Sequence, residues 1–384
     1  MGLPRRKKLV FAAVAVAGFL ALLELTARAV EIWKPPMAVD IGAGFVPWSR
    51  VFVPSSADSG VLETAATKRS SFRTQTFAAR KDASTLRIVV LGGSSVNYAD
   101  REFREMAARV LDAFRPRWNR VELVNAGGFG YGSGRLRIVA AEILEYDPDV
   151  VLLHEANNEF EEVEQLELAS LGTLGVQEAG SRSALVRVTR DLLVAWQAER
   201  LAAEHARLKA ATDTVPDLDR AWDHDFTAAE VAQRMALFRE NFAAIADACA
   251  QRNVPLVVGT VPSNIVYPAW RDKTVDYQQV RDLFAQGRFE EGKALGRRLL
   301  VEYRNRHQSS DAENGIIRSL ASDRGFALAD VEAAITAAEP HGLPGETLFI
   351  DHCHLNDRGR GILAGTYEAA VVAVLRTASA SPPR

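Results

Sequence analysis

Ser94, Asp351 and His354 are the residues whose types and spacing could carry out covalent chemistry in this chain. Ser94 follows Gly92 and Gly93 at the end of an apolar run, where a sharp turn would expose its hydroxyl. Asp351 and His354 are three residues apart, a spacing that can bring both side chains to one side. A histidine can take the proton of a serine hydroxyl when a carboxylate orients the imidazole ring. These residue types predict acyl transfer through a serine nucleophile.

Acyl transfer also requires N–H donors that stabilise the negative oxygen of the tetrahedral intermediate. The candidates are the backbone N–H groups of Ser94 and Gly127 and the side-chain amide of Asn158. Gly127 has no side chain to hinder the approach of a substrate to its amide. His154 and Glu155 come shortly before Asn158, and each is either a substrate contact or a hydrogen-bonded structural residue.

His352 stands two residues before His354 and is either an alternative base or a structural residue; the register of the motif favours His354. A metal site built from His352, His354 and Asp351 is conceivable, because His-x-His spacing occurs in metal centres. No further ligand cluster accompanies these residues in the sequence, so no metal is expected. The glycine-rich run at 127–134 is not interpreted as a dinucleotide-binding site, because no Gly-x-Gly-x-x-Gly motif follows the first predicted strand. No other cofactor is expected.

The segments that must position these residues alternate between strands and helices. Five apolar runs are predicted to be strands: Leu86–Leu91, Val121–Val124, Asp149–Leu153, Val254–Val261 and Phe326–Val331. Helical spacing predicts helices over Arg101–Phe114, Arg135–Glu145, Ala228–Arg252, Asp311–Arg324 and Asp357–Arg376. Such alternation favours a parallel sheet with right-handed crossovers. The reactive loops would then share the carboxyl edge of that sheet.

Two stretches interrupt the alternation, and we interpret them as helical insertions at about 161–225 and 270–306. The first contains a predicted helix, Ala184–Leu208. The second contains two predicted antiparallel helices, Tyr277–Phe284 and Phe289–Tyr303, which are similar to one tetratricopeptide unit. A single unit of this kind cannot bury its own apolar face. The helical pair at 277–303 is therefore expected to pack on the main domain or to bind a protein partner.

The N-terminus combines a basic cluster, Arg5–Lys8, with an uncharged apolar run, Leu9–Leu23. This pattern is typical of a secretory signal peptide or a signal anchor. Ala27–Ala29 resembles a cleavage site, but the charges of Glu24 and Arg28 weigh against cleavage. We expect residues 1–33 to be an uncleaved anchor in the inner or plasma membrane, with the rest of the chain facing the periplasm or exterior. Cleavage would give a secreted protein, and a buried helix of a cytoplasmic protein remains an alternative.

The bulk composition sets few limits. The 384 residues are 48% apolar and 25% charged with a net charge of −3, which is ordinary globular composition and gives no signal for nucleic-acid binding. Residues 34–85 contain scattered prolines and small polar residues without a period, which predicts a juxtamembrane tether that partly wraps the domain. Residues 379–384 are expected to be a tail. Cys249 and Cys353 lie far apart in the sequence, and their redox state stays open.

Four short motifs, taken in order, resemble those of the SGNH (GDSL-like) hydrolase family. They are Gly92-Gly93-Ser94, Asn125-Ala126-Gly127, Ala156-Asn157-Asn158-Glu159 and Asp351-His352-Cys353-His354. The resemblance covers roughly residues 86–374. It implies a three-layer α/β/α, flavodoxin-like fold with five parallel strands over residues 86–378, including the two insertions.

The same resemblance implies roles for individual residues. Ser94 would be the nucleophile, His354 the base and Asp351 the group that orients it, with Gly127 and Asn158 completing an oxyanion hole. The sequence departs from the family pattern at three positions: Gly93 stands where an aspartate is frequent, Ala156 replaces a glycine and Glu159 replaces an aspartate.

The predicted function is that of a serine-dependent esterase that acts on O-acyl esters, O-acetyl in particular, through an acyl-enzyme on Ser94. Its substrate would be an acylated small molecule or a glycan at the cell envelope, a class suggested by location and family resemblance alone. Two alternatives stay open. The same residues could transfer an acyl group to an extracellular polysaccharide, or the chain could be a non-catalytic envelope assembly protein that docks through its helical pair.

Overall fold

Strand β4 (Thr85–Gly92) lies inside a five-stranded parallel sheet, and all eight of its residues are buried. A strand covered on both faces is expected to be a continuous aliphatic run, as this one is. It pairs with β5 (Arg120–Gly127) on one side and β6 (Val150–His154) on the other. Strands β7 (Leu256–Gly259) and β8 (Ala327–Ala329) extend the sheet to the order β5-β4-β6-β7-β8. The predicted α/β fold with five parallel strands is confirmed.

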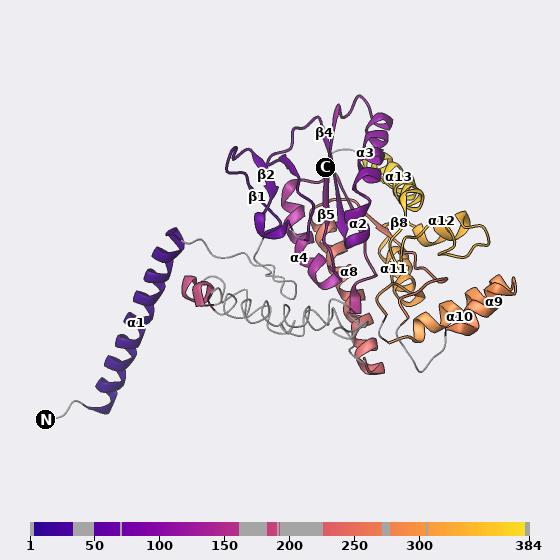
Figure 1. Cartoon of the computed structure of the whole chain (residues 1–384). Helices are drawn as coiled ribbons and strands as arrows, with labels where there is room; N and C mark the ends of the chain where they lie inside the picture. Colours follow the sequence, from indigo (N-terminus) through magenta and orange to yellow (C-terminus); the bar gives the residue numbers. More distant parts are fainter. Residues whose placement is uncertain are drawn as a thin grey trace, which may run out of the picture. The chain divides into compact units, whose positions relative to one another are not determined.

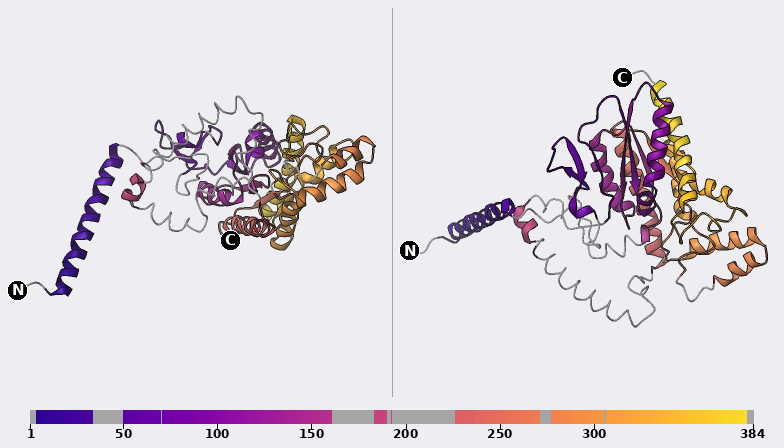
Figure 2. Two further views of the ribbon diagram at one scale, coloured as in Figure 1. Left: turned by 60° about the horizontal axis from the view of Figure 1, so that its bottom comes forward. Right: turned by 45° about the horizontal axis from the view of Figure 1, so that its top comes forward.

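Helices cover both faces of this sheet (Figures 1 and 2). One layer contains α3 (Asp100–Ala113), α12 (Val331–Ala338) and α13 (Asp357–Ala380), and the other contains α4 (Ser133–Ile143), α8 (Ala228–Gln251) and α11 (Asp311–Arg324). Alternate residues of β4, among them Ile88 and Val90, belong to one apolar cluster with Phe103 of α3 and Tyr367 of α13. The two layers thus hold the sheet rigidly and leave its carboxyl edge to the connecting loops.

Two helices begin at capping boxes, which are recognisable in the sequence. Helix α8 starts at a capping box formed by Thr227 and Glu230, and α11 starts at one formed by Ser310 and Glu313. Helix α12 is different, because none of the predicted helices covers it. Its first amides are capped by the side chain of Asp330, which accepts a hydrogen bond from the N–H of Ala333 at 3.3 Å. Residues 331–338 are thus a helix that the sequence pattern did not predict.

Residues 50–84 are folded, which corrects the expectation of an irregular tether over this part. Three strands, β1 (Phe52–Pro54), β2 (Val61–Thr64) and β3 (Thr76–Ala78), form a small antiparallel sheet. With three or four residues each, they are too short to display a period of two. The buried guanidinium of Arg87 in β4 ties this sheet to the domain, since it donates to the carbonyl of Ala78 at 2.7 Å.

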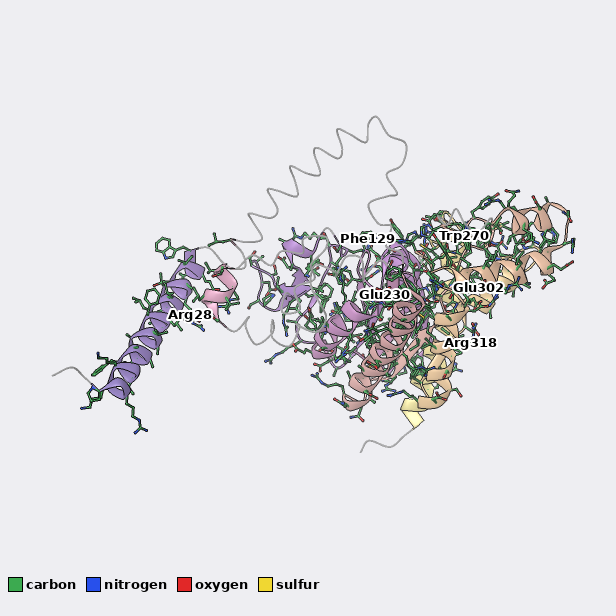
Figure 3. All side chains as sticks on the ribbon, turned by 90° about the horizontal axis from the view of Figure 1, so that it is seen from below. Arg28, Phe129, Glu230, Trp270, Glu302 and Arg318 are labelled. Carbon is green, nitrogen blue, oxygen red and sulfur yellow. The ribbon has the colours of Figure 1, made fainter. Side chains whose placement is uncertain are left out.

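The helical pair α9 (Gln278–Ala285) and α10 (Phe289–Glu302) forms as predicted and packs on its neighbours in the same unit. The hydroxyl of Tyr277 donates to the carbonyl of Ile265 at 2.7 Å. The indole of Trp270, labelled in Figure 3, stacks on the ring of Tyr303 at a centroid distance of 4.4 Å. The apolar face that this pair cannot bury alone is therefore covered, at least in part, by its own unit.

The structure, a computed structural model, describes residues 4–33, 50–69, 71–160, 183–189, 192, 226–270, 277–304 and 306–380. Most of the first insertion, including the predicted helix Ala184–Leu208 beyond its first turns, lies outside these residues. The chain divides into two compact units, one comprising residues 1–49 and 166–221 and the other residues 50–165 and 222–384.

Helix α1 (Arg5–Trp33) is the main described element of the first unit. Among the described residues it is the one helix that is long and apolar enough to cross a membrane by length and composition, with a mean hydropathy of 2.3. Towards its C-terminal end the carboxylate of Glu24 accepts a hydrogen bond from the hydroxyl of Ser183 at 2.6 Å, and Glu31 pairs with Arg187 at 2.6 Å.

Candidate active site

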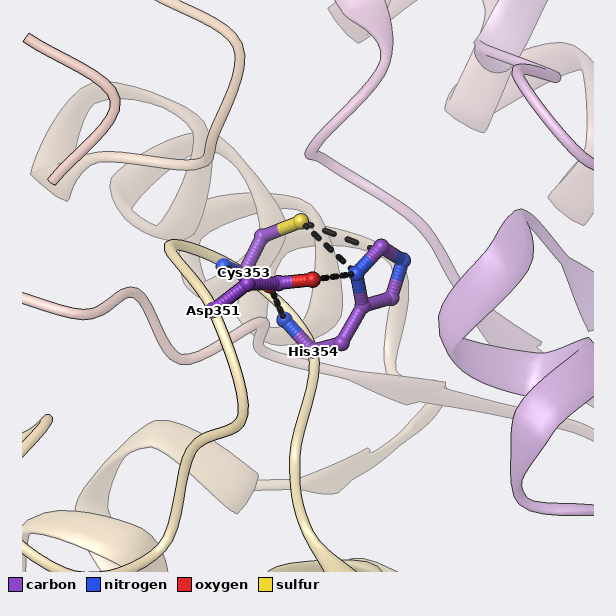
Figure 4. Close-up of side chains that lie close together, drawn as sticks. All are labelled: Asp351, Cys353 and His354. Atoms are coloured by element: carbon purple, nitrogen blue, oxygen red, sulfur yellow. Dashed lines mark hydrogen bonds and ion pairs between the residues drawn. The ribbon is translucent and has the colours of Figure 1, made fainter.

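Ser94, His354 and Asp351 form a continuous chain of hydrogen bonds. Ser94 is the first residue of the short helix α2 (Ser94–Tyr98), directly after the end of β4. Its Oγ lies 2.7 Å from Nε2 of His354, and Nδ1 of the same ring lies 2.6 Å from Oδ2 of Asp351. Figure 4 shows the carboxylate of Asp351 directed at the ring of His354. The arrangement is that of a nucleophile, a base and the group that orients the base.

The sheet register explains why the loops after three strands meet here. Gly92 at the end of β4 lies beside Gly127 of β5 and His154 of β6. A Cβ atom on Gly92 would lie 2.2 Å from the carbonyl oxygen of His154, so only glycine fits where the chain turns into α2. The turn brings the Ser94 hydroxyl to the carboxyl edge, where ligands bind in open α/β sheets.

The loop that carries Asp351 and His354 closes on itself just before α13. Phe349 and Leu355 form an isolated antiparallel bridge across it. The Oδ1 atom of Asp351 accepts the N–H groups of Cys353 at 2.8 Å and His354 at 2.7 Å. Partial burial raises the pKa of Asp351, but the hydrogen bond from the His354 ring and those two N–H groups outweigh it and hold the pKa below its ordinary range. The carboxylate thus stays ionised and oriented.

Asn264, in the loop after β7, holds the same segment from outside. Its side-chain Nδ2 donates to the carbonyl of Asp351 at 2.9 Å, and its backbone N–H donates to the carbonyl of His352 at 3.0 Å. Its Oδ1 accepts the N–H of Tyr267 at 2.8 Å, which fixes the amide orientation. Sequence reasoning missed this residue, because no motif marks an asparagine that acts through a loop 87 residues away.

The structure separates the other candidate histidines from the serine. Of the pair His352 and His354, it is His354 that contacts Ser94, and the two imidazole centroids are 6.4 Å apart. His154 is only 1% exposed and packs against the ring of Tyr367, which favours the structural one of its two predicted roles. Burial lowers the pKa of His154 to about 3, which keeps its ring neutral.

The role of the Gly127 amide in an oxyanion hole stays a prediction, and in this structure the amide has a side-chain partner. Its N–H donates to the side-chain Oδ1 of Asn125 at 2.9 Å. The Nδ2 group of Asn125 in turn donates to the carbonyl of Val96 and to Asp100, so the asparagine cannot turn over without losing both bonds. Of the other expected donors, the N–H of Ser94 opens helix α2 and therefore has no carbonyl partner within the helix.

Gly130 lies in the loop after β5. It adopts a left-handed backbone conformation with a φ of 68°. Among the described residues, no hydrogen bond uses its N–H group. The loop runs past the site, because the carbonyl of Tyr131 accepts from Asn158 and the ring of Phe129 contacts that of Tyr98.

The Asn158 amide is buried beside Gly93, the residue before Ser94, and is held by Glu155. Its Nδ2 donates to the carbonyl of Tyr131 at 3.1 Å and to the carboxylate of Glu155 at 3.2 Å. Glu155 is only 2% exposed and also accepts the backbone N–H of Asn158 at 2.8 Å, so it orients this loop, which favours the structural one of its two predicted roles. A Cβ on Gly93 would lie 2.2 Å from Glu155 and 2.4 Å from Asn158. This explains the glycine at position 93.

One exposed aromatic ring contacts the base, and a second exposed ring contacts the first. The ring of Tyr98 meets the His354 imidazole edge-on at a centroid distance of 4.9 Å, and the ring of Phe129 lies 5.4 Å from that of Tyr98. The two side chains are 46% and 40% exposed, and Phe129 is labelled in Figure 3. Large exposed apolar side chains next to reactive groups indicate a binding surface.

Comparisons with known proteins show no matching protein-family profile and no matching curated protein. Solved structures do resemble the chain. An acetyl xylan esterase is 16% identical with a TM-score of 0.40, over 74% of this chain and 100% of the esterase. A GDSL-like lipase from Bacteroides thetaiotaomicron is 10% identical with a TM-score of 0.37, over 76% and 88%. A member of the lipolytic protein G-D-S-L family from Veillonella parvula is 10% identical with a TM-score of 0.37, over 75% and 98%. At these values the chemistry is judged from the contacts of the site itself.

Proposed function

We propose that the protein is a serine-dependent ester hydrolase that acts on O-acyl groups. The observation that carries this proposal is the pair of hydrogen bonds that joins Ser94 to His354 at 2.7 Å and His354 to Asp351 at 2.6 Å. A serine alone is a weak nucleophile, and a hydrogen-bonded base with an oriented ring is what activates it. The order hydroxyl, imidazole and carboxylate also fixes the direction of the proton transfer.

The reaction proceeds in two displacements. Oγ of Ser94 attacks the acyl carbonyl while its proton moves to Nε2 of His354, and the carbonyl oxygen becomes an oxyanion. The imidazolium, stabilised by Asp351, then gives the proton to the departing alcohol, which leaves an acyl-enzyme. Water attacks this ester with His354 again as the base, and the carboxylic acid departs as Ser94 regains its proton.

The oxyanion is stabilised by the N–H of Ser94, and the N–H of Gly127 is the second expected donor, once it leaves the side chain of Asn125. Donors fixed in place before the reaction lower the barrier because they need no reorganisation as charge develops. Asn158 contributes a third hydrogen bond once its amide exchanges the contact with the Tyr131 carbonyl at 3.1 Å for the oxyanion.

The exposed rings of Tyr98 and Phe129 support an acylated glycan as the substrate. Each pyranose ring carries a face of C–H groups, and aromatic side chains offer large apolar surfaces with little conformational freedom to lose. O-acetyl groups on an envelope polysaccharide would then lie at Ser94 while the sugar rests on the aromatic pair. The apolar helix α1 supports attachment of this activity to a membrane, with its basic start on the cytoplasmic side.

A fluorophosphonate probe tests the proposal on the full chain. The probe reacts only with an activated serine, so peptide mapping should find it on Ser94. Ser94→Ala should abolish labelling, whereas Ser95→Ala, the matched control at the next position, should label at the wild-type rate. Equal labelling of wild type and Ser94→Ala would overturn the assignment. Turnover of an acetylated oligosaccharide with and without a sugar acceptor then separates hydrolysis from acyl transfer to a glycan.

A further inference from the structure

The described part of the first insertion, residues 183–189, contacts the C-terminal part of helix α1 within the same compact unit (Figure 1). The carboxylate of Glu24 accepts a hydrogen bond from the hydroxyl of Ser183 at 2.6 Å. It also accepts the backbone N–H groups of Ala184 at 3.0 Å and Leu185 at 3.1 Å. One carboxylate on α1 therefore takes three donors from a single turn of the insertion.

A bidentate ion pair attaches the same segment a second time. Nε and Nη2 of Arg187 donate to the two carboxylate oxygens of Glu31 at 2.7 and 2.6 Å, and both side chains are mostly buried. Ala27, which lies on α1 between the two attachment points, is only 5% exposed. Arg187 is the one charged residue within 183–189, so the ion pair leaves this segment without an unpaired charge.

The membrane attachment proposed above sets the depth of Glu24. The uncharged run at 9–23 is 15 residues long and measures about 22 Å as a helix, less than the roughly 30 Å of a bilayer's hydrocarbon core. Charged residues must therefore enter the core at one end. The N-terminal end would bring in Lys7 and Lys8, two cations in succession. The C-terminal end brings in Glu24 and Arg28, which form an ion pair of 2.9 Å and are less costly to bury together.

A carboxylate in the outer part of the core has little water to bind, so its hydrogen bonds must come from the protein. The donors of residues 183–185 supply them, and they can do so only at the depth of Glu24. The exposed side chains suit such a position. Val186 is 47% exposed, and Ile32 and Trp33 at the end of α1 are exposed as well. Aliphatic side chains with a tryptophan nearby are typical of the membrane–water interface.

We propose that residues 183–189 are a second membrane contact, a short segment that enters the outer membrane–water interface beside α1. The partner is the lipid itself: Val186 contacts acyl chains, while Glu24 and Arg187 are satisfied within the protein. A single anchor helix becomes a two-point contact that fixes how the insertion leaves the bilayer. The inference rests on the membrane attachment in the proposed function and not on the ester chemistry.

Spin labels test the contact on the full chain in lipid nanodiscs. The native cysteines, Cys249 and Cys353, are buried, so the wild type is the labelling blank. A label on Val186→Cys should collide with oxygen about twofold or more as often as with a water-soluble nickel chelate. Val16→Cys, within the apolar run, is the lipid control. Ala113→Cys, at the exposed end of α3, is the water control.

The three labels separate the possible failures. A Val186 label that behaves like the Ala113 label, with the Val16 label in lipid, overturns the second contact and leaves the anchor standing. A Val16 label in water overturns the membrane attachment and the second contact together. A Val186 label that is shielded from both reagents and broadened by a neighbouring label shows that a second copy of the chain covers this surface, which overturns lipid as the partner.

Glu24→Leu tests what holds the segment at this depth. The variant lengthens the apolar run, so α1 stays in the bilayer, but it removes the acceptor of three hydrogen bonds. The Val186 label should become about threefold or more accessible to the nickel chelate, while the Val16 label stays unchanged. Thr26→Ala is the matched control, because the Thr26 hydroxyl bonds within its own helix, to the carbonyl of Leu22 at 2.8 Å. Equal accessibility in Glu24→Leu and the wild type would overturn the role of Glu24.

Discussion

The Oγ atom of Ser94 lies 2.7 Å from Nε2 of His354, although the two residues stand 260 positions apart in the sequence. The sheet positions the serine, since β4 ends directly before it. The loop between Phe349 and Leu355 positions the histidine. Asn264, in the loop after β7, holds that loop through a hydrogen bond to the carbonyl of Asp351. Two rigid supports thus converge on one hydrogen bond, which is the arrangement expected of a preorganised site.

Asp351→Asn should reduce kcat for an activated acetyl ester by about 10³- to 10⁴-fold. An amide nitrogen facing Nδ1 forces the imidazole proton onto Nε2, which removes the acceptor that Ser94 needs. Asp357→Asn is the matched control. Asp357 is the same residue type and is the first residue of α13, but its side chain is 72% exposed. Steady-state kinetics of both variants and the wild type decide the matter, and an Asp351→Asn enzyme with an unchanged kcat would refute the role of Asp351.

Asn158→Ala should lower kcat by about 10²- to 10³-fold if its amide reaches the oxyanion. The neighbouring variant Asn157→Ala separates catalysis from folding, because Oδ1 of Asn157 accepts the N–H of Ser309 at 2.9 Å and serves packing. That control should lower the unfolding temperature and leave kcat within about twofold of the wild type, since the effect falls on stability alone. Equal kcat values for Asn158→Ala and wild type would leave the oxyanion to backbone donors only.

Much of the fold could be predicted from the sequence, because the strands of a parallel sheet buried on both faces are uninterrupted aliphatic runs. Strand β4, for example, exceeds the predicted Leu86–Leu91 by one residue at each end. The small antiparallel sheet could not be predicted, because its strands contain only three or four residues and their partner contacts lie in the tertiary structure. Helix α12 escaped for a related reason: its single capping residue, Asp330, follows a strand directly.

Some residues of the site could likewise be predicted from the sequence, and others could not. Ser94 and His354 could be found because chemistry demands their residue types in recognisable motifs. The donors of the oxyanion hole are less sharply marked, since any residue can present a backbone N–H group, and only the structure reveals that the amide of Gly127 is bonded to Asn125. The close approach of Gly93 to the side chain of Glu155 could not be predicted either. It depends on two loops that meet only in the folded chain, where a Cβ at position 93 would clash with Glu155.

Asn264→Ala should lower kcat by about 10- to 100-fold while KM changes by less than about threefold, because the loop with Asp351 loses its support and the substrate surface is untouched. Asn264→Asp retains the acceptor for the N–H of Tyr267 at 2.8 Å but loses the donor to the carbonyl of Asp351. Its kcat should therefore fall nearly as far as that of the alanine variant. A kcat near the wild-type value for Asn264→Asp would show that the donor is dispensable.

Phe129→Ala should raise KM for an acetylated oligosaccharide by about two- to tenfold, which corresponds to the loss of one aromatic contact of about 0.5–1.5 kcal/mol. The ring is 40% exposed and contacts Tyr98, not His354, so the chemistry should be unaffected. A small activated acetyl ester is the control substrate, and its kcat/KM should stay within about twofold of the wild type because it does not reach the ring. Parallel losses on both substrates would count against a sugar-binding role.

His154 should make the protein lose stability as the pH falls below 6.5. Burial lowers its pKa to about 3 in the folded state, whereas the unfolded chain takes up the proton near the ordinary value of 6.5. Between these two values the unfolded state binds more protons, so the free energy of unfolding falls with decreasing pH, by about 1.4 kcal/mol per unit where the difference is one full proton. The buried Nδ1 has no hydrogen-bond partner among the described residues, so His154→Phe removes the proton site without breaking a bond to that atom.

Urea unfolding of both proteins from pH 7.5 to 4.5 provides the measurement. Carboxylates contribute to the slope in the wild type and the variant alike, so the difference between the two curves isolates His154. The variant should lose less stability over this range, with the gap opening below pH 6.5. Parallel curves would mean that the imidazole is protonated in the folded state and that its surroundings admit a charge, contrary to its complete burial.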